Sequence, residues 1–183
     1  MVTVRIGGAS RQYEAGTTLL TISRDFAHRH PAPIVAALLD NDINDLQTAV
    51  KEDCQVSFID LTSEEGQRVY RRSLAFVLVA AAGELFPGAE VTVEHSLSKG
   101  LYCEVHLDRE LTAEDVDRLQ EGMRQIIAAD RPFVRRIMPR SEAVALFEAA
   151  GQDAKVKLFS QLQCDTVSVY YCGDAFGYFY GTM

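Results

Sequence analysis

The chain has 183 residues, of which 48% are apolar and 24% are charged. This is ordinary soluble composition, and it fits one large or two small domains. The formal net charge of −8 repels phosphate backbones at long range and disfavours nonspecific nucleic-acid binding. The four cysteines form no CxxC pair, and the longest apolar run, residues 74–83, is shorter than the ~20 residues of a membrane span. We therefore expect a cytoplasmic protein with free thiols and no membrane association.

The first sixty residues have the pattern of a small β-rich domain. Val2, Val4 and Ile6 alternate with polar residues, which predicts a half-buried strand. The further predicted elements are a hairpin turn at 7–8, a strand at 11–13, a threonine-capped helix from 17–18 that prolines 31 and 33 end, a strand at 34–39, a turn at 40–42, a short strand or turn at 45–50 and a strand at 56–59. This β-β-α-β-β order predicts a β-grasp domain over residues 1–62.

The remaining residues, 63–183, show alternating helical and strand periods, which predict a second α+β domain. The capping box from Thr112 to Asp115 marks the start of its amphipathic helix. The predicted elements are a polar linker at 64–66, a helix at 67–86, strands at 91–93 and 101–107 around a turn at 98–100, a helix at 113–131, a strand at 133–137, a helix from 140 or 141 to 150, and a β-rich tail at 167–180.

Several side-chain groups have the composition of a binding site. The candidate RNA contacts are Arg68, Arg71 and Arg72, and Arg131, Arg135, Arg136 and Arg140. We favour solvated faces for both groups, since this is the common role of surface charge. A metal site of His95, Cys103 and His106 is disfavoured, because residues three apart on a strand point to opposite faces. The aromatic tail could stack a nucleobase, but packing is the favoured role of its rings; they are Tyr170, Tyr171, Phe176, Tyr178, Phe179 and Tyr180.

The longest specific pattern is G-L-Y-C-E-V-H-L-D-R-E-L-T-A-E-D-V at residues 100–116. It resembles, without a gap, the segment G-F-Y-Y-D-V-D-L-D-R-x-L-T-x-E-D-V of the threonyl-tRNA synthetase editing domain. The resemblance covers essentially the whole chain, because residues 1–61 resemble the TGS domain that opens those synthetases. It implies a ubiquitin-like TGS domain over 1–62 and an editing-like α+β sandwich over 63–183.

The residues that match the editing site of that family are replaced. Its H-S-x-x-H element corresponds to residues 72–76, and its C-R-G-P-H element corresponds to residues 179–183. The matching positions are Arg72, Phe76, Lys155, Gly177, Phe179 and Met183. Only Lys155 and the Gly173-Asp174 pair keep the family's residue. Ester hydrolysis needs groups that take and give a proton near neutral pH, whereas arginine cannot release its proton and phenylalanine has none. We therefore expect no catalytic residue, metal or cofactor in this chain.

The last twelve residues, C-G-D-A-F-G-Y-F-Y-G-T-M, are similar to a C-G-D-x-x-x-Y-F-Y-G-x-M pattern of uridine kinase-like proteins. In those proteins, TGS and editing-like domains precede a P-loop kinase domain of the phosphoribulokinase and uridine kinase type. The chain itself has no GxxxxGK[ST] phosphate-binding loop. The resemblance implies a C-terminal kinase domain outside this chain and an ATP-dependent uridine or other nucleoside kinase as the parent protein.

The expected function is therefore that of a non-catalytic accessory or regulatory region of a nucleoside kinase-like protein. Its expected partners are the kinase domain, an RNA, or a small nucleoside or amino-acid ligand. The candidate ligand pocket comprises Ser73, Tyr102, Asp174, Tyr178 and Tyr180. Two alternatives remain open: an editing hydrolase that acts on seryl-tRNA, and a tRNA-binding module related to threonyl-tRNA synthetase.

Overall fold

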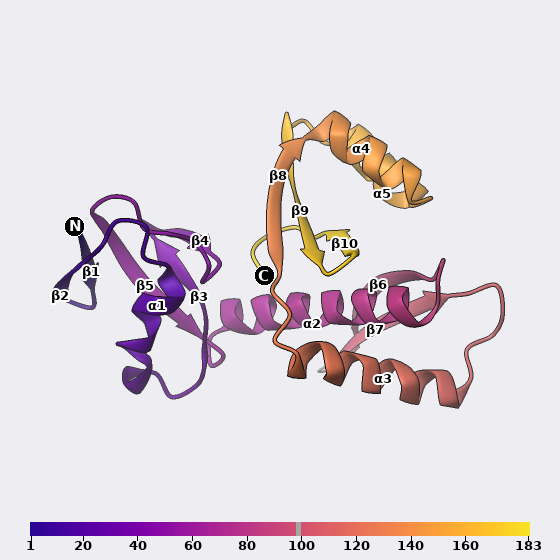
Figure 1. Cartoon of the computed structure of the whole chain (residues 1–183), viewed down its shortest axis with the longest axis horizontal. Coiled ribbons are helices and arrows are strands. Elements are labelled where there is room, and N and C mark those ends of the chain that lie inside the picture. Colours follow the sequence, from indigo (N-terminus) through magenta and orange to yellow (C-terminus); the bar gives the residue numbers. More distant parts are fainter. Residues whose placement is uncertain (98–99) are drawn as a thin grey trace. The chain divides into compact units, whose positions relative to one another are not determined.

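The structure, a computed structural model, describes residues 1–97 and 100–183. It comprises two compact units (Figure 1): unit 1 is Met1–Ser73 with Tyr180–Met183, and unit 2 is Leu74–Phe179. Both units combine helices with strands, which confirms the predicted α+β class. Within the described ranges, no helix has both the length and the apolar character that crossing a membrane requires.

A five-stranded sheet in the order β2-β1-β5-β3-β4 forms most of unit 1. Its strands are β1 (Val2–Ile6), β2 (Ala9–Tyr13), β3 (Ile34–Leu39), β4 (Asp42–Asn44) and β5 (Cys54–Asp60). β1 and β5 are parallel, and the other neighbouring pairs are antiparallel. With one α-helix between β2 and β3, the order is β-β-α-β-β-β. It has the predicted start but differs after the helix, because the short strand β4 forms at 42–44 and residues 45–50 form no strand.

The helix of that unit, α1 (Leu19–Arg24), begins where the sequence predicts but ends earlier. The Thr18 side chain caps it by accepting a hydrogen bond from the Thr21 amide at 3.3 Å. The prediction that the helix continues to Pro31 was wrong. The amides after Arg24 bond to carbonyls three residues back, which tightens the last turn, and a short 3₁₀ helix, η1 (Ala27–Arg29), follows.

The helix α2 (Glu64–Leu85) starts at once after the sheet, so the linker predicted at residues 64–66 is helical. Gly66 explains why the first turn fits there. A Cβ on Gly66 would lie 2.0 Å from the carbonyl oxygen of Asp60, and only glycine allows this approach. One helix turn later, Val69 is buried against Ala36 and Ile59 of the sheet.

Unit 2 begins with the second half of α2, a β-hairpin and α3 (Ala113–Ala128). The hairpin pairs β6 (Glu90–Leu97) with β7 (Gly100–His106); Ser98 and Lys99 of its predicted turn lie outside the described residues. These elements share a core around Phe86 and Leu119. Gly122 lets α3 approach α2, because a Cβ there would lie 3.1 Å from Leu85 Cδ1.

A second part of unit 2 packs two helices on a three-stranded sheet in the order β10-β9-β8 (Figure 1). Its elements are β8 (Val134–Pro139), α4 (Arg140–Ala149), α5 (Asp153–Gln161), β9 (Thr166–Cys172) and β10 (Ala175–Tyr178). Phe147, Phe159 and Val169 form its core and are 0% exposed. No element was predicted between residues 150 and 167, whereas the structure has the helix α5 there, and Lys155 lies in it. This helix is short and has no side-chain N-cap, so it lacks the signals on which sequence patterns depend.

Candidate functional site

An aromatic cluster surrounds Phe76, the position that the resemblance assigns to the second editing histidine. Phe76, in the unit 2 half of α2, is 0% exposed. Its ring meets Phe133 edge-on at a centroid distance of 5.1 Å and Phe179 at 5.4 Å. The α2 helix therefore packs near the C-terminal aromatic segment. Edge-to-face rings at these distances make a favourable packing contact.

Gly177, in β10, completes this cluster by leaving room for the rings. The resemblance assigns an acidic residue of the family to this position. A Cβ on Gly177 would lie 3.0 Å from Phe179 Cε2 and 3.5 Å from Phe76 Cε2. An acidic side chain would have to displace Phe179, so the two replacements depend on each other physically.

Arg72, which the resemblance assigns to the first editing histidine, contacts the C-terminal tail within unit 1. Its guanidinium donates a hydrogen bond to the carbonyl oxygen of Thr182 and lies against Gly181, whose φ is +97°. The Thr182 hydroxyl in turn donates to the carbonyl oxygen of Ile43 at 3.1 Å. Met183, which the resemblance assigns to the histidine of the C-R-G-P-H element, is buried. The guanidinium thus serves in tail packing.

Lys155 is half-buried on α5. Burial lowers the pKa of its ammonium group because desolvation penalises the charged form, and the nearby carboxylate of Glu90 partly opposes this shift. The amino group of Lys155 can donate hydrogen bonds in either protonation state.

The five candidate pocket residues have different surroundings. Ser73 donates to the carbonyl oxygen of Val69 in its own helix at 3.0 Å. Tyr178 packs edge-on against Phe159 at 4.9 Å, on the side of β10 away from Gly177. The others are Tyr102 on β7, 43% exposed, Asp174 in the exposed turn after β9, and Tyr180 in unit 1, 89% exposed. A hydrogen bond from Tyr102 to Glu104, together with the charge of Glu104, raises the pKa of the Tyr102 phenol.

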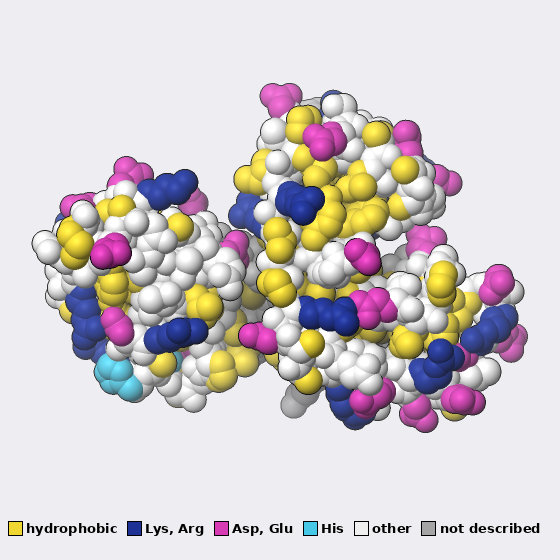
Figure 2. All heavy atoms as spheres, viewed as in Figure 1, with side chains coloured by type: hydrophobic (Ala, Val, Ile, Leu, Met, Phe, Trp, Pro, Cys, Tyr) yellow, Lys and Arg dark blue, Asp and Glu magenta, His cyan; other side chains and the backbone are white. Residues whose placement is uncertain are grey.

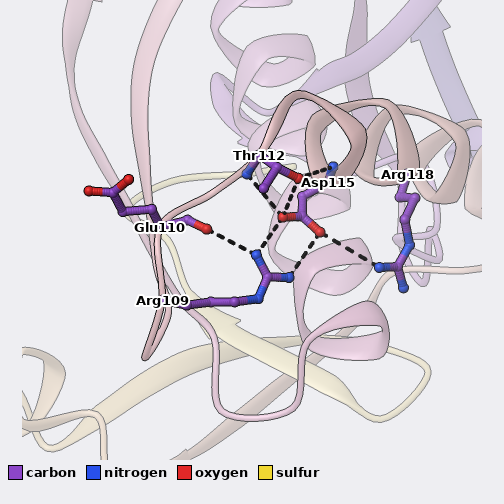
Figure 3. Close-up of polar contacts among 5 residues, drawn as sticks. All are labelled: Arg109, Glu110, Thr112, Asp115 and Arg118. Atoms are coloured by element: carbon purple, nitrogen blue, oxygen red, sulfur yellow. Dashed lines mark hydrogen bonds and ion pairs between the residues drawn. The ribbon is translucent and has the colours of Figure 1, made fainter.

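The segment that matches most closely, residues 100–116, builds a polar network (Figure 3). Asp115 accepts hydrogen bonds from Arg109 Nη1 at 2.6 Å and Nη2 at 3.0 Å, and from the Thr112 amide and hydroxyl. Arg109, with further hydrogen bonds from Thr112, holds the pKa of Asp115 well below its usual range. The predicted capping box is confirmed, whereas the role of Arg109 was missed. Asp115 stays ionised and fixes the start of α3.

Most of the candidate RNA-contacting arginines have contacts within the chain. Arg68 pairs with Glu65 at 2.6 Å, and Arg131 pairs with Glu84. Arg140 donates to the carbonyl oxygen of Leu162 at 2.6 Å. Arg136 differs, because its guanidinium lies over the ring of Tyr171, with Cζ 4.5 Å from the ring centroid.

Phe133 belongs to the aromatic cluster, and the sequence analysis had given it no role. Its position directly after Pro132, at the start of a strand, was the available signal. Among the side chains that the structure describes, no three from His, Cys, Asp or Glu lie together in a way that could hold a metal ion. The cluster around Phe76 offers apolar packing and no proton donor or acceptor among its rings.

The chain resembles threonine–tRNA ligases over most of its length. It is 35% identical over 167 residues to the ligase of Pelobacter propionicus, which is 91% of this chain and 26% of that ligase. The ligase of Syntrophomonas wolfei is 32% identical over 176 residues, 95% of this chain and 28% of the ligase. No family model matches. The chain spans about a quarter of the length of these curated relatives. Over 91% of its length, the chain is homologous to the N-terminal region of threonine–tRNA ligases.

Proposed function

We propose that this chain is a synthetase-derived accessory module that does not hydrolyse aminoacyl-tRNA. The main support for this proposal is the burial of Phe76, which is 0% exposed and contacts Phe133 and Phe179. A hydrolytic site needs a positioned water beside a group that accepts its proton. Aromatic rings pack around the position that the resemblance assigns to an editing histidine, and these rings cannot exchange a proton.

Arg72 supports the same proposal from unit 1. Its guanidinium donates to the Thr182 carbonyl, and arginine stays protonated at any pH at which the protein is folded. It can therefore neither ligate a metal nor act as a base. An editing hydrolase remains the second candidate, because Lys155 and Asp174 keep the residues of the family.

The module is proposed to serve a nucleoside kinase-like protein, by binding its kinase domain, an RNA or a small nucleoside or amino-acid ligand. The support is the tail pattern at residues 172–183 together with the replaced editing positions. The homologous ligases provide the origin of the module and do not by themselves assign it a kinase partner.

The natural protein that contains this chain provides the test of the kinase assignment. It should transfer phosphate from ATP to uridine or another nucleoside, and it should not attach threonine to tRNA. Both reactions are measured on the same preparation, with a threonine–tRNA ligase as the positive control for aminoacylation. Threonine attachment without nucleoside phosphorylation would refute the assignment.

A further inference from the structure

The sheet of unit 2 leaves one cross-strand row of apolar side chains partly uncovered. Val134, Tyr171 and Phe176 are paired across β8, β9 and β10, so they lie side by side on one face. The same face is buried under α4 and α5 in the neighbouring rows. Val134 is 44% exposed, and the two aromatic residues are half-buried. We name this row, with Arg136, the aromatic shelf.

The aromatic rings of the shelf are fixed by packing contacts with the core and with each other. Phe176 packs edge-on against Phe147 at 5.2 Å, and Phe147 belongs to the core. Tyr171 and Phe176 lie 6.0 Å apart, with an interplanar angle of 37°. Figure 2 shows hydrophobic side chains gathered beside β9 and β10 on the viewed face of this unit. The shelf is therefore a preformed stacking surface.

Arg136 adds a positive charge to this surface. Its side chain is exposed, and its guanidinium lies 4.5 Å from the Tyr171 ring centroid. Among the described residues, no carboxylate lies within ion-pair distance of Arg136. The chain as a whole has a net charge of −8, so a cation without an acidic partner stands out on its surface. The Arg136 guanidinium on the Tyr171 ring is complementary to a small anion that also has a π system.

We propose that the aromatic shelf binds an unpaired nucleotide, with the base stacked on the rings and the phosphate held by Arg136. Aromatic residues and arginine planes are the surfaces on which unpaired bases stack, and guanidinium matches the geometry of phosphate. The nucleotide is either free or the end of an RNA strand. This site specifies the ligand within the proposed accessory role, and it uses none of the residues that match the editing site.

The test measures binding of AMP, adenosine, inorganic phosphate and a short 5′-phosphorylated oligoadenylate to the whole chain. The variants are Phe176→Leu, which keeps apolar contact with the core, and Arg136→Gln. Arg135→Gln is the matched control, because it removes the same charge one residue away, on the opposite face of β8, where Arg135 donates to Ser168. Circular dichroism melting curves verify that each variant is folded.

We expect AMP to bind more tightly than adenosine or phosphate alone. Each shelf variant should weaken AMP binding about tenfold, the effect of losing one stacking or phosphate contact, and Arg135→Gln should leave it unchanged. Tighter binding of the oligoadenylate would identify an RNA end as the source, and equal binding would identify a free nucleotide.

Absence of AMP binding at millimolar concentration, or equal losses in Arg135→Gln and Arg136→Gln, would overturn the proposal. If a shelf variant does not fold, AMP-induced NMR shifts in the wild-type chain decide: shifts at Tyr171 and Phe176 support the site, and shifts confined to other residues refute it. The two proposals fail separately. Absence of AMP binding would refute the nucleotide site and not the proposed lack of hydrolysis, whereas hydrolysis of seryl-tRNA would refute the proposed function and not the nucleotide site.

Discussion

At the scale of single residues, Phe76 and Gly177 form a matched pair. The ring of Phe76 fills the space beside α2, and the missing side chain at Gly177 lets Phe179 close over it. A histidine at position 76 would have an imidazole among apolar rings. Buried polar groups without partners are costly, so the present sequence has adapted to the aromatic residue.

Phe76→His should therefore destabilise the protein by at least about 2 kcal/mol, since it loses apolar burial and buries an unpaired ring nitrogen. The measurement is urea unfolding followed by circular dichroism. Tyr180→His is the control: this side chain is 89% exposed, and its replacement should change stability by less than about 0.5 kcal/mol. Equal stability of the two variants would contradict the packing described for Phe76.

Asp60 makes the stability of unit 1 depend on pH. It accepts hydrogen bonds from the side chain and amide of Thr62 and from His30 Nδ1 at 2.8 Å. Thr62, and then His30, lower the pKa of Asp60 to about 2. A carboxyl group whose pKa is lower in the folded than in the unfolded chain stabilises the fold at pH values above its unfolded pKa of about 3.9. This stabilisation is lost as the pH falls toward the folded-state pKa of about 2.

The wild-type chain should accordingly be more stable than Asp60→Asn at neutral pH, and the difference should shrink between about pH 4 and pH 2. Thermal melting of both proteins across this range measures it. A difference that stays constant with pH would show that the carboxylate is not specifically stabilised.

At the scale of elements, α2 begins in unit 1 and continues into unit 2. Its first turn touches the end of β5 through Gly66. Gly83, near the other end of the same helix, is exposed and has no atom within 4 Å of its hypothetical Cβ. The two glycines share a helix and differ only in their surroundings.

Gly83→Ala should stabilise the protein by about 0.5–1 kcal/mol through helix propensity. Gly66→Ala should destabilise it despite the same gain, because the new methyl group collides with the Asp60 carbonyl. Thermal melting of the two variants tests this difference in sign. Stabilisation by both would mean that the start of α2 does not approach β5 as described.

The elements that local patterns encode were predictable from the sequence. Alternation identified β1, and the Thr112–Asp115 box placed the start of α3. Elements set by tertiary contacts were not. The start of α2 looked like a linker because Gly66 is a poor helix former, and its role depends on a carbonyl in another strand. Arg109 gave no local signal, because its partner Asp115 lies six residues away across the turn that precedes α3.

At the scale of the whole molecule, the replaced positions are divided between two units. Phe76, Gly177 and Phe179 pack together in unit 2, while Arg72 and Met183 belong to unit 1. The sequence comparison could identify these positions as replaced. It could not predict that the replacements form packed clusters, because this depends on ring geometry and on the course of the tail. The similarity to threonine–tRNA ligases covers 91% of the chain.

The most direct test of this account is the rate at which the chain deacylates seryl-tRNA. The substrate is a threonine-specific tRNA that has been charged with serine, and it is incubated with increasing concentrations of the chain at neutral pH. A threonine–tRNA ligase with an intact H-S-x-x-H element is the positive control. We predict a rate equal to spontaneous hydrolysis at every concentration, because the rings around Phe76 and the guanidinium of Arg72 cannot accept a proton. A rate that rises in proportion to the concentration of the chain would contradict the account and would assign the module to the editing hydrolases.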